Sequence, residues 1–129
     1  MALRLGVPFV MLRKSGKMPN MIYGKPYTKE YEGNDQLGIP RGHIVKGDKV
    51  LLIDDLIATG GTLSAGIELC HKVGAEATSC ACMVELKILG GAAKAKAAGA
   101  KDVWAFMSEE ILINEAKLPE GYVDDGKAH

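Results

Sequence analysis

Residues 50–62 have the sequence VLLIDDLIATGGT, and this segment decides the fold class. The apolar run from Val50 to Ile53 predicts a β-strand that is buried on both faces. Two adjacent carboxylates, Asp54 and Asp55, follow this run, and a loop of small residues comes next. Ligands of open α/β sheets bind at the carboxyl ends of the strands. We therefore expect an α/β fold with a ligand site directly after this strand.

The small-residue loop has the composition of an anion site. Threonine hydroxyls, backbone N–H groups and the N-terminus of the following helix all favour a phosphate. A carboxylate beside a phosphate would be repelled by it. We therefore expect the two acids to bind ribose hydroxyls or Mg²⁺ while the loop binds the phosphate. The loop residues are Ala58, Thr59, Gly60, Gly61 and Thr62.

Two better-known glycine motifs do not fit this segment. The nucleotide-triphosphate loop needs a lysine and then Ser or Thr after its last glycine, whereas Gly61 is followed by Thr62 and Leu63. The dinucleotide motif needs three spaced glycines after a strand, and the sequence contains no such pattern. A bare glycine pair would indicate only a tight connection, but two acids together with T-G-G-T favour a binding site.

Length, charge and cysteine content limit the class of protein. The 129 residues are typical of one domain, and the formal net charge of zero gives no reason to expect nucleic acid or a membrane as a partner. The three cysteines are odd in number and lie in apolar surroundings, which predicts buried thiols in a reducing compartment. The sequence shows no signal peptide or membrane-spanning stretch, so a cytoplasmic location is expected.

Apolar periodicity and turn residues predict alternating strands and helices along the chain. A long excursion runs from Arg13 to about Gly38 and includes a predicted hairpin through residues 31–39. This alternation indicates one α/β domain over residues 1–129, with a parallel sheet, helices on both of its faces and a peripheral acidic tail from about residue 108. Strands are expected at residues 7–12, 49–53, 77–86 and 102–107, and helices at 61–73 and 92–98.

Four segments resemble adenine phosphoribosyltransferases, which belong to the type I phosphoribosyltransferases. The run from Asp54 to Thr62 is similar to their motif for phosphoribosyl pyrophosphate (PRPP). Arg13 to Pro19 is similar to their basic segment, Tyr27 to Tyr31 to their flexible catalytic loop, and Val84 to Leu86 to a segment near their base site. The resemblance implies a three-layer, Rossmann-like α/β core built on a parallel sheet.

The resemblance also implies a reaction, in which adenine displaces pyrophosphate from C1 of PRPP to give AMP and pyrophosphate. It implies that Asp54 and Asp55 hold the ribose hydroxyls and that the 58–62 loop holds the 5′-phosphate. Mg²⁺ would be the cofactor, held mainly through PRPP rather than by a protein cage. A homodimer is the expected assembly.

Further site residues follow from the resemblance. Glu30 matches the glutamate that contacts the base near N7, so it is the candidate for relaying the purine proton. Arg13, Lys14 and Lys17 are the candidates for pyrophosphate, because a departing polyanion needs positive charge. Taken alone, each of these three side chains is more typical of a basic surface loop than of a pyrophosphate site. Residues expected to close over the site or to lie near the base are Tyr27, Tyr31, Glu85 and Leu86.

The chain departs from the family pattern at its N-terminus. Family members carry a small hood that recognises the base and a first core strand before the segment matched by Met1 to Gly6, so we expect an N-terminally incomplete core. This departure favours a second hypothesis. The chain could be a PRPP-binding or nucleotide-binding module, or an inactive truncated paralogue that pairs with an active subunit.

Overall fold

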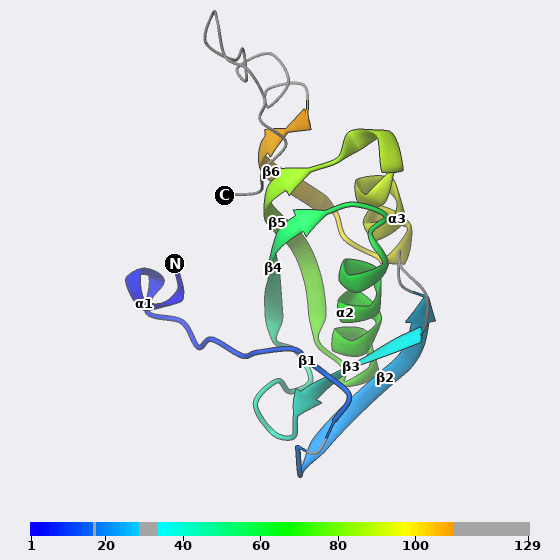
Figure 1. Ribbon diagram of the computed structural model, residues 1–129. Coiled ribbons are helices and arrows are strands. Elements are labelled where there is room, and N and C mark those ends of the chain that lie inside the picture. The colour runs from blue at the N-terminus through cyan, green and yellow to red at the C-terminus, as the bar shows by residue number, and fades with distance from the viewer. Residues whose placement is uncertain (17, 29–33, 110–129) are drawn as a thin grey trace, which may run out of the picture.

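The computed structural model describes residues 1–16, 18–28 and 34–109, and it contains two separate β-sheets (Figure 1). The larger sheet is parallel, with the order β4-β5-β6. Its strands are β4 (Lys49–Ile57), β5 (Glu76–Glu85) and β6 (Asp102–Ser108). The smaller sheet is antiparallel, with the order β1-β3-β2. Its strands are β1 (Arg13–Lys14), β2 (Met21–Thr28) and β3 (Asn34–Pro40).

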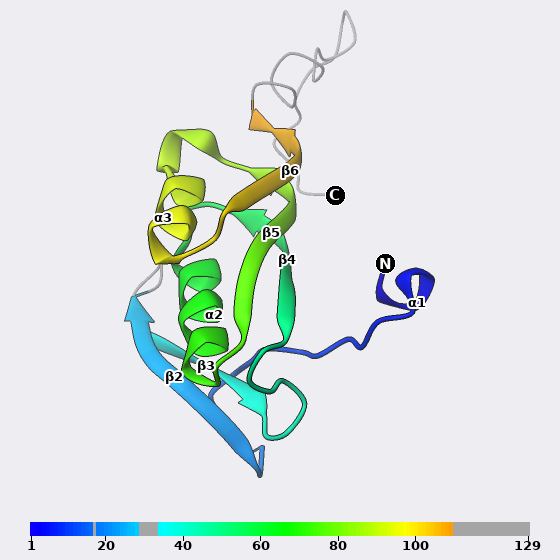
Figure 2. The ribbon, with the colours of Figure 1, turned by 180° about the vertical axis from the view of Figure 1, so that it is seen from behind.

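The helices are α1 (Ala2–Leu5), α2 (Gly61–Lys72) and α3 (Gly91–Ala98), together with the 3₁₀ helix η1 (Lys87–Leu89). Helices α2 and α3 lie on one face of the parallel sheet, and the β2–β3 hairpin covers the outer side of α2 (Figures 1 and 2). The described residues therefore form three layers: parallel sheet, helices and hairpin. None of the helices among these residues is long and apolar enough to cross a membrane.

The core lies on both sides of α2. Ile67, Leu69 and Cys70 of this helix are completely buried because one side of the helix packs on the parallel sheet and the other on the hairpin. The predicted alternation of strands and helices between residues 49 and 107 is confirmed, with boundaries within a few residues of the expected ones. The prediction that the cysteines pack in the core is also confirmed, since all three are buried and free. Burial raises the pKa of the Cys70 thiol to about 11, so it is protonated at neutral pH.

The prediction of a strand at residues 7–12 is wrong. The segment is extended and alternates, with Val10 and Leu12 packed against the core and Phe9 exposed. In the described part of the chain, however, it has no strand beside it, and a strand exists only through hydrogen bonds to a neighbour.

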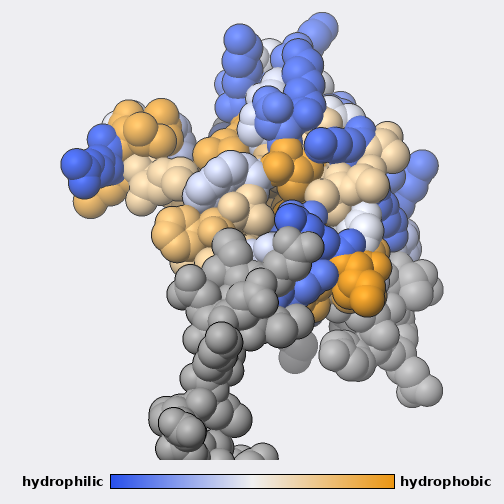
Figure 3. Space-filling view, turned by 90° about the horizontal axis from the view of Figure 1, so that it is seen from above, coloured by the Kyte–Doolittle hydropathy of each residue, from blue (hydrophilic) through white to orange (hydrophobic). Residues whose placement is uncertain are grey.

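The expectation that the strand beginning at Val50 is buried on both faces is also wrong. Leu51 is 45% exposed and Ile53 is 53% exposed, whereas Leu52 is buried against α2. Side chains alternate across a strand, so only one face of β4 meets the helices. The expectation of helices on both faces is therefore wrong for the described residues. Helices α2 and α3 lie on one face, and α1 stands apart from the sheet on the other side (Figures 1 and 3).

The predicted hairpin exists, but its two strands do not both lie within residues 31–39. Its strands are β2 and β3, paired in antiparallel register from Met21 with Pro40 to Thr28 with Asn34. The sequence did not indicate β2, because Gly24, Lys25 and Pro26 interrupt any apolar alternation. The turn itself and the acidic tail beyond residue 109 lie outside the described residues.

Candidate functional site

The site forms where β4 passes into α2. Strand β4 continues to Ile57, four residues beyond the expected end, and Gly60 then reverses the chain with a φ of 77°. Because Asp54 and Asp55 are strand residues, they point to opposite faces of the sheet. Asp54 is on the helix side, partly buried, and Asp55 is exposed on the other side.

A small pocket lies at this junction. Its lining is made of Asp54, the end of β4, the loop and the first turn of α2. Asp54 therefore shares a pocket with the loop, while Asp55 does not line it. The lining residues are Asp54, Leu56, Ile57, Ala58, Gly60, Gly61, Thr62 and Leu63.

The N-terminal end of α2 gives the pocket an anion-binding character. The Ser64 N–H donates to the Gly60 carbonyl at 3.0 Å, which is the first turn of the helix. Helix geometry directs the N–H groups of the residues before Ser64 out of this end rather than to intrahelical carbonyls. The partial positive charge of the helix terminus adds to their attraction for a phosphate.

Asp54 is held in place by its neighbour. The Asp55 N–H donates to Asp54 Oδ1 at 2.9 Å, which fixes the carboxylate against the backbone. Partial burial raises the pKa of Asp54, and this hydrogen bond from Asp55 opposes the rise. The remaining carboxylate oxygen can accept a hydrogen bond from a hydroxyl in the pocket.

The second segment beside the loop runs from Glu85 to Gly91. Strand register places Glu85 beside Ile57 of β4, and the Leu86 N–H donates to the Ile57 carbonyl at 2.8 Å. Both predicted base-vicinity residues therefore lie next to the start of the loop. The Gly91 backbone packs directly on the loop, and a side chain at Gly91 would collide with the Ala58 carbonyl. Gly91 was not among the predicted site residues, although the adjacent glycines at positions 90 and 91 were a visible signal.

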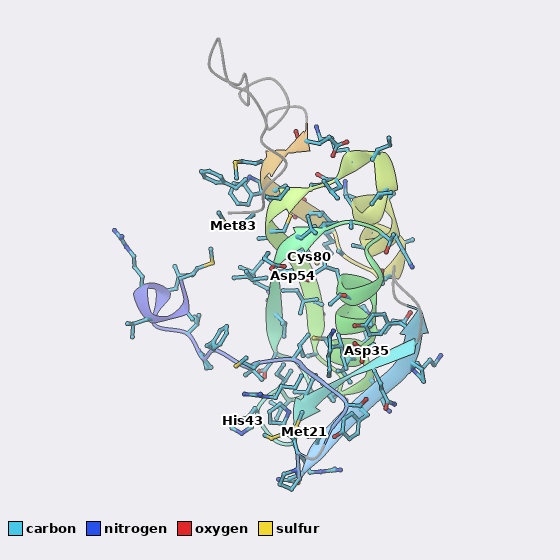
Figure 4. The ribbon with its side chains drawn as sticks, in the orientation of Figure 1. Met21, Asp35, His43, Asp54, Cys80 and Met83 are labelled. Atoms are coloured by element: carbon cyan, nitrogen blue, oxygen red, sulfur yellow. The ribbon has the colours of Figure 1, made fainter. Side chains whose placement is uncertain are left out.

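The structure does not bring the basic residues to the loop. Arg13 and Lys14 form β1, which pairs with β3 and lies toward the far end of α2 from the loop (Figures 1 and 2). The Lys14 ammonium contacts Asp35 Oδ2 at 3.1 Å, and the resulting hydrogen bond raises the pKa of Lys14. Figure 4 shows Asp35 on the hairpin, well separated from Asp54 on β4. Lys14 as a pyrophosphate ligand thus stays a prediction.

The remaining predicted residues are only partly covered by the structure. Tyr27 is on β2, opposite Asp35, and packs against the core. Lys17, Glu30 and Tyr31 lie outside the described residues.

Comparison with known proteins gives consistent results. A model of the phosphoribosyl transferase domain matches residues 1–123. The chain is 47% identical over 91 residues to the adenine phosphoribosyltransferase of Acidiphilium cryptum (strain JF-5), which covers 70% of this chain and 53% of that protein. It is 48% identical over 95 residues to adenine phosphoribosyltransferase 3 of Arabidopsis thaliana, covering 74% of this chain and 51% of that protein. The chain thus spans about half the length of the curated relatives it matches.

Solved structures of adenine phosphoribosyltransferases have a fold similar to that of this chain. The adenine phosphoribosyltransferase from Trypanosoma brucei, in complex with AMP, pyrophosphate and ribose-5-phosphate, superposes with a TM-score of 0.79 at 32% identity. That match covers 99% of this chain and 58% of the Trypanosoma chain. The enzyme from Giardia lamblia complexed with 9-deazaadenine matches with a TM-score of 0.76 at 33% identity, covering 83% of this chain and 60% of that one.

Proposed function

The chain belongs to the phosphoribosyl transferase domain family, and on that premise we propose that it binds PRPP and transfers the phosphoribosyl group to adenine. The observation that carries the proposal is the pocket that joins the Asp54 carboxylate to the first turn of α2. A carboxylate accepts hydrogen bonds from ribose hydroxyls, and a helix N-terminus binds a phosphate. One pocket therefore offers both groups that a 5-phosphoribosyl ligand needs.

The proposed reaction is a displacement at C1 of PRPP. The bond from C1 to adenine N9 forms, the bond from C1 to the pyrophosphate oxygen breaks, and the purine proton passes to Glu30. The transition state resembles an oxocarbenium ion, so carboxylates close to the ribose stabilise it. Asp54 is proposed for this role from the helix side, and Asp55 is the proposed second ribose ligand from the open side. In the proposed reaction Glu85 and Leu86 lie near the base and Tyr27 and Tyr31 near the closing loop.

Positive charge for the leaving group is proposed to come from Arg13, Lys14 and Lys17. Lys14 would have to exchange its contact with Asp35 for one with pyrophosphate. Such an exchange would move the Lys14 side chain, which is 67% exposed, and would remove one contact from the Asp35 carboxylate, which is 10% exposed.

Mg²⁺ is proposed as the cofactor, entering with PRPP. In the described ranges no group of three acidic, histidine or cysteine side chains could hold a metal, and Asp54 supplies a single carboxylate to the pocket. Mg²⁺ in such sites keeps several waters and is held largely by substrate phosphates, which fits this donor set. When bound, the ion would neutralise charge on the pyrophosphate. We further propose a homodimer and, from the buried free cysteines, a location in the reducing cytoplasm.

A second candidate function is a module that binds a ribose phosphate without turnover. The observation in its favour is that Arg13 and Lys14 lie toward the far end of α2 from the pocket, where Lys14 contacts Asp35. Such a module could pair with an active subunit. The two candidates share the ribose-phosphate site and differ only in turnover.

Thermal melting of the purified chain with Mg²⁺ tests the shared site. Ribose 5-phosphate and PRPP, each supplied at about 100 times its dissociation constant, are expected to stabilise the fold by about 2.7 kcal/mol. Adenine-dependent release of pyrophosphate from PRPP then separates the candidates: release supports the enzyme, and stabilisation without release supports the binding module.

Glu68→Gln on the exposed side of α2 is the matched control and should melt and respond to ligand like the parent chain. If neither ligand shifts the melting temperature, the phosphoribosyl site proposed for this chain is wrong.

A further inference from the structure

The loop that would hold the phosphate rests on a second piece of backbone. A side chain added at Gly60 would collide with the Gly91 carbonyl and lie 2.9 Å from Gly91 Cα. A side chain added at Gly91 would lie 2.8 Å from the Gly60 nitrogen. The two backbones are thus in direct contact, and Gly91 cannot shift toward the loop without displacing Gly60.

Gly91 follows η1 along the chain through Gly90, and a short series of backbone hydrogen bonds holds residues 86–90 together. The Leu89 N–H donates to the Leu86 carbonyl and the Gly90 N–H to the Lys87 carbonyl, both at 3.0 Å. Residues 86–91 therefore form one compact unit. Its amino end is anchored to β4 where Leu86 donates to Ile57.

A carboxylate from a distant part of the sequence fastens this unit to the sheet. The Lys87 N–H donates to Glu109 Oε2 at 2.6 Å, and the Ile88 N–H donates to Glu109 Oε1 at 3.0 Å. Glu109 directly follows β6, whose last residue pairs with Glu85 of β5. Both oxygens of one carboxylate are thus used on two N–H groups, an arrangement of charge-assisted hydrogen bonds about twice as strong as neutral ones.

We propose that Glu109 is a positioning residue for the phosphate loop: it holds η1, η1 holds Gly91, and Gly91 sets the backbone of Gly60. This inference rests on the proposed function, because the position of the loop affects ligand binding only if the loop binds a phosphate. It adds a residue that lies outside all four segments that resemble adenine phosphoribosyltransferases. Glu109 does not line the pocket itself and acts through the η1 segment.

Nuclear magnetic resonance and hydrogen exchange on the ligand-free chain test the coupling. For Glu109→Ala the Lys87 and Ile88 amides should exchange about tenfold faster or more, the size expected for the loss of one charge-assisted hydrogen bond. The Gly60 and Gly61 amide resonances should also shift. Glu109→Gln keeps one acceptor oxygen and should show a smaller change in both measurements.

Affinity for ribose 5-phosphate, measured by calorimetry, is the second readout. Glu109→Ala is expected to weaken binding by about tenfold, and Glu109→Gln by a smaller factor. Glu76→Gln is the control, because Glu76 is exposed at the opposite end of β5, and this variant should bind as tightly as the parent chain. The amide spectrum of each variant shows whether it is folded, and Glu109→Gln keeps the test available if the alanine variant is not.

Two results are distinguishable. If exchange at Lys87 and Ile88 accelerates while the Gly60 and Gly61 resonances stay in place, η1 is not coupled to the loop and the positioning role is refuted. If the parent chain does not bind ribose 5-phosphate, the proposed function fails, and the amide shifts still decide whether Glu109 sets the loop.

Discussion

Adjacent residues at the end of β4 have different surroundings and therefore different expected roles. Asp54 lies on the helix side, where burial raises its pKa, and it shares a pocket with the phosphate loop. Asp55 lies on the exposed side and donates its N–H to Asp54. The sequence motif assigns the same role to both acids, whereas the alternation of side chains along a β-strand favours Asp54 as the primary ribose ligand in the proposed function.

Asp54→Asn is expected to stabilise the fold at neutral pH while weakening binding. Burial raises the folded-state pKa of Asp54 above its ordinary value of 3.8. At pH values above the folded-state pKa the ionised carboxylate therefore lowers the stability of the fold, and this loss disappears as the pH falls below 3.8. Urea midpoints should therefore be higher for the variant at pH 7 and equal to those of the parent near pH 3. Ribose 5-phosphate affinity should fall about tenfold or more.

The exposed Asp102→Asn is the control for that substitution and should leave the pH dependence unchanged. A midpoint difference for Asp54→Asn that is the same at both pH values would contradict the assigned cause.

Gly60→Ala is expected to destabilise the chain by about 2 to 4 kcal/mol, from a left-handed backbone and from collision with Gly91. Gly42→Ala separates these causes. Gly42 has a similar φ of 82° but nothing within 4 Å of an added Cβ, so only the backbone cost of about 1 to 2 kcal/mol remains. Urea unfolding of both variants measures the two losses in free energy of unfolding. Equal losses would show that the Gly91 backbone moves away from the added methyl group.

At the scale of elements, α2 has two functions. Its N-terminal end forms part of the pocket, and its two sides join the parallel sheet to the hairpin. The hairpin approaches the helix closely at Gly24, where an added Cβ would lie 3.6 Å from Leu69 Cβ. The Lys72 ammonium also donates to the Tyr23 carbonyl at 2.6 Å. The helix whose N-terminal end is proposed to bind the phosphate therefore also packs against both sheets.

Ile67→Ala is expected to cost about 2 to 5 kcal/mol, because Ile67 is 0% exposed and its removal leaves a cavity between the layers. The matched control is Leu3→Ala in α1. Leu3 is 97% exposed, so this change should stay within about 0.5 kcal/mol of the parent. Denaturant unfolding monitored by circular dichroism measures both, and a small effect at Ile67 would mean that the layers close around the missing atoms.

At the scale of the whole molecule, the parallel sheet has one covered face and one open face. The open face carries Leu51, Ile53, Met83, Trp104 and Phe106, each between 45% and 62% exposed. In Figure 4 Met83 points away from the helices, on the side where α1 stands. Contiguous exposed apolar residues of this kind promote association.

The purified chain is therefore expected to associate as its concentration rises. Trp104 is the only tryptophan, so its acrylamide quenching should be strong in dilute solution and weaker in concentrated solution. Trp104→Lys with Phe106→Lys should lower the particle size in light scattering. Val45→Lys, at an exposed apolar position outside the sheet, should not. A parent chain that scatters as a monomer at every concentration would contradict this expectation.

Neighbouring residues were enough to predict the local elements and the loop that is proposed to bind the phosphate. Apolar periodicity, the two acids and the glycines act over a few neighbouring residues, so the strand, loop and helix between residues 49 and 72 were predictable. The hairpin strand β2 was not, because its residues have no alternation and are held by pairing with β3.

The tertiary structure alone decided which distant groups meet at the loop. Glu85 and Gly91 reach the loop, and Glu109 reaches η1, only because β5 and β6 add to β4 in a fixed register. It also decided that Lys14 contacts Asp35 and that one sheet face stays open. Hydrogen-bond ladders join residues 20 or more positions apart, and no local pattern encodes which of them will be neighbours.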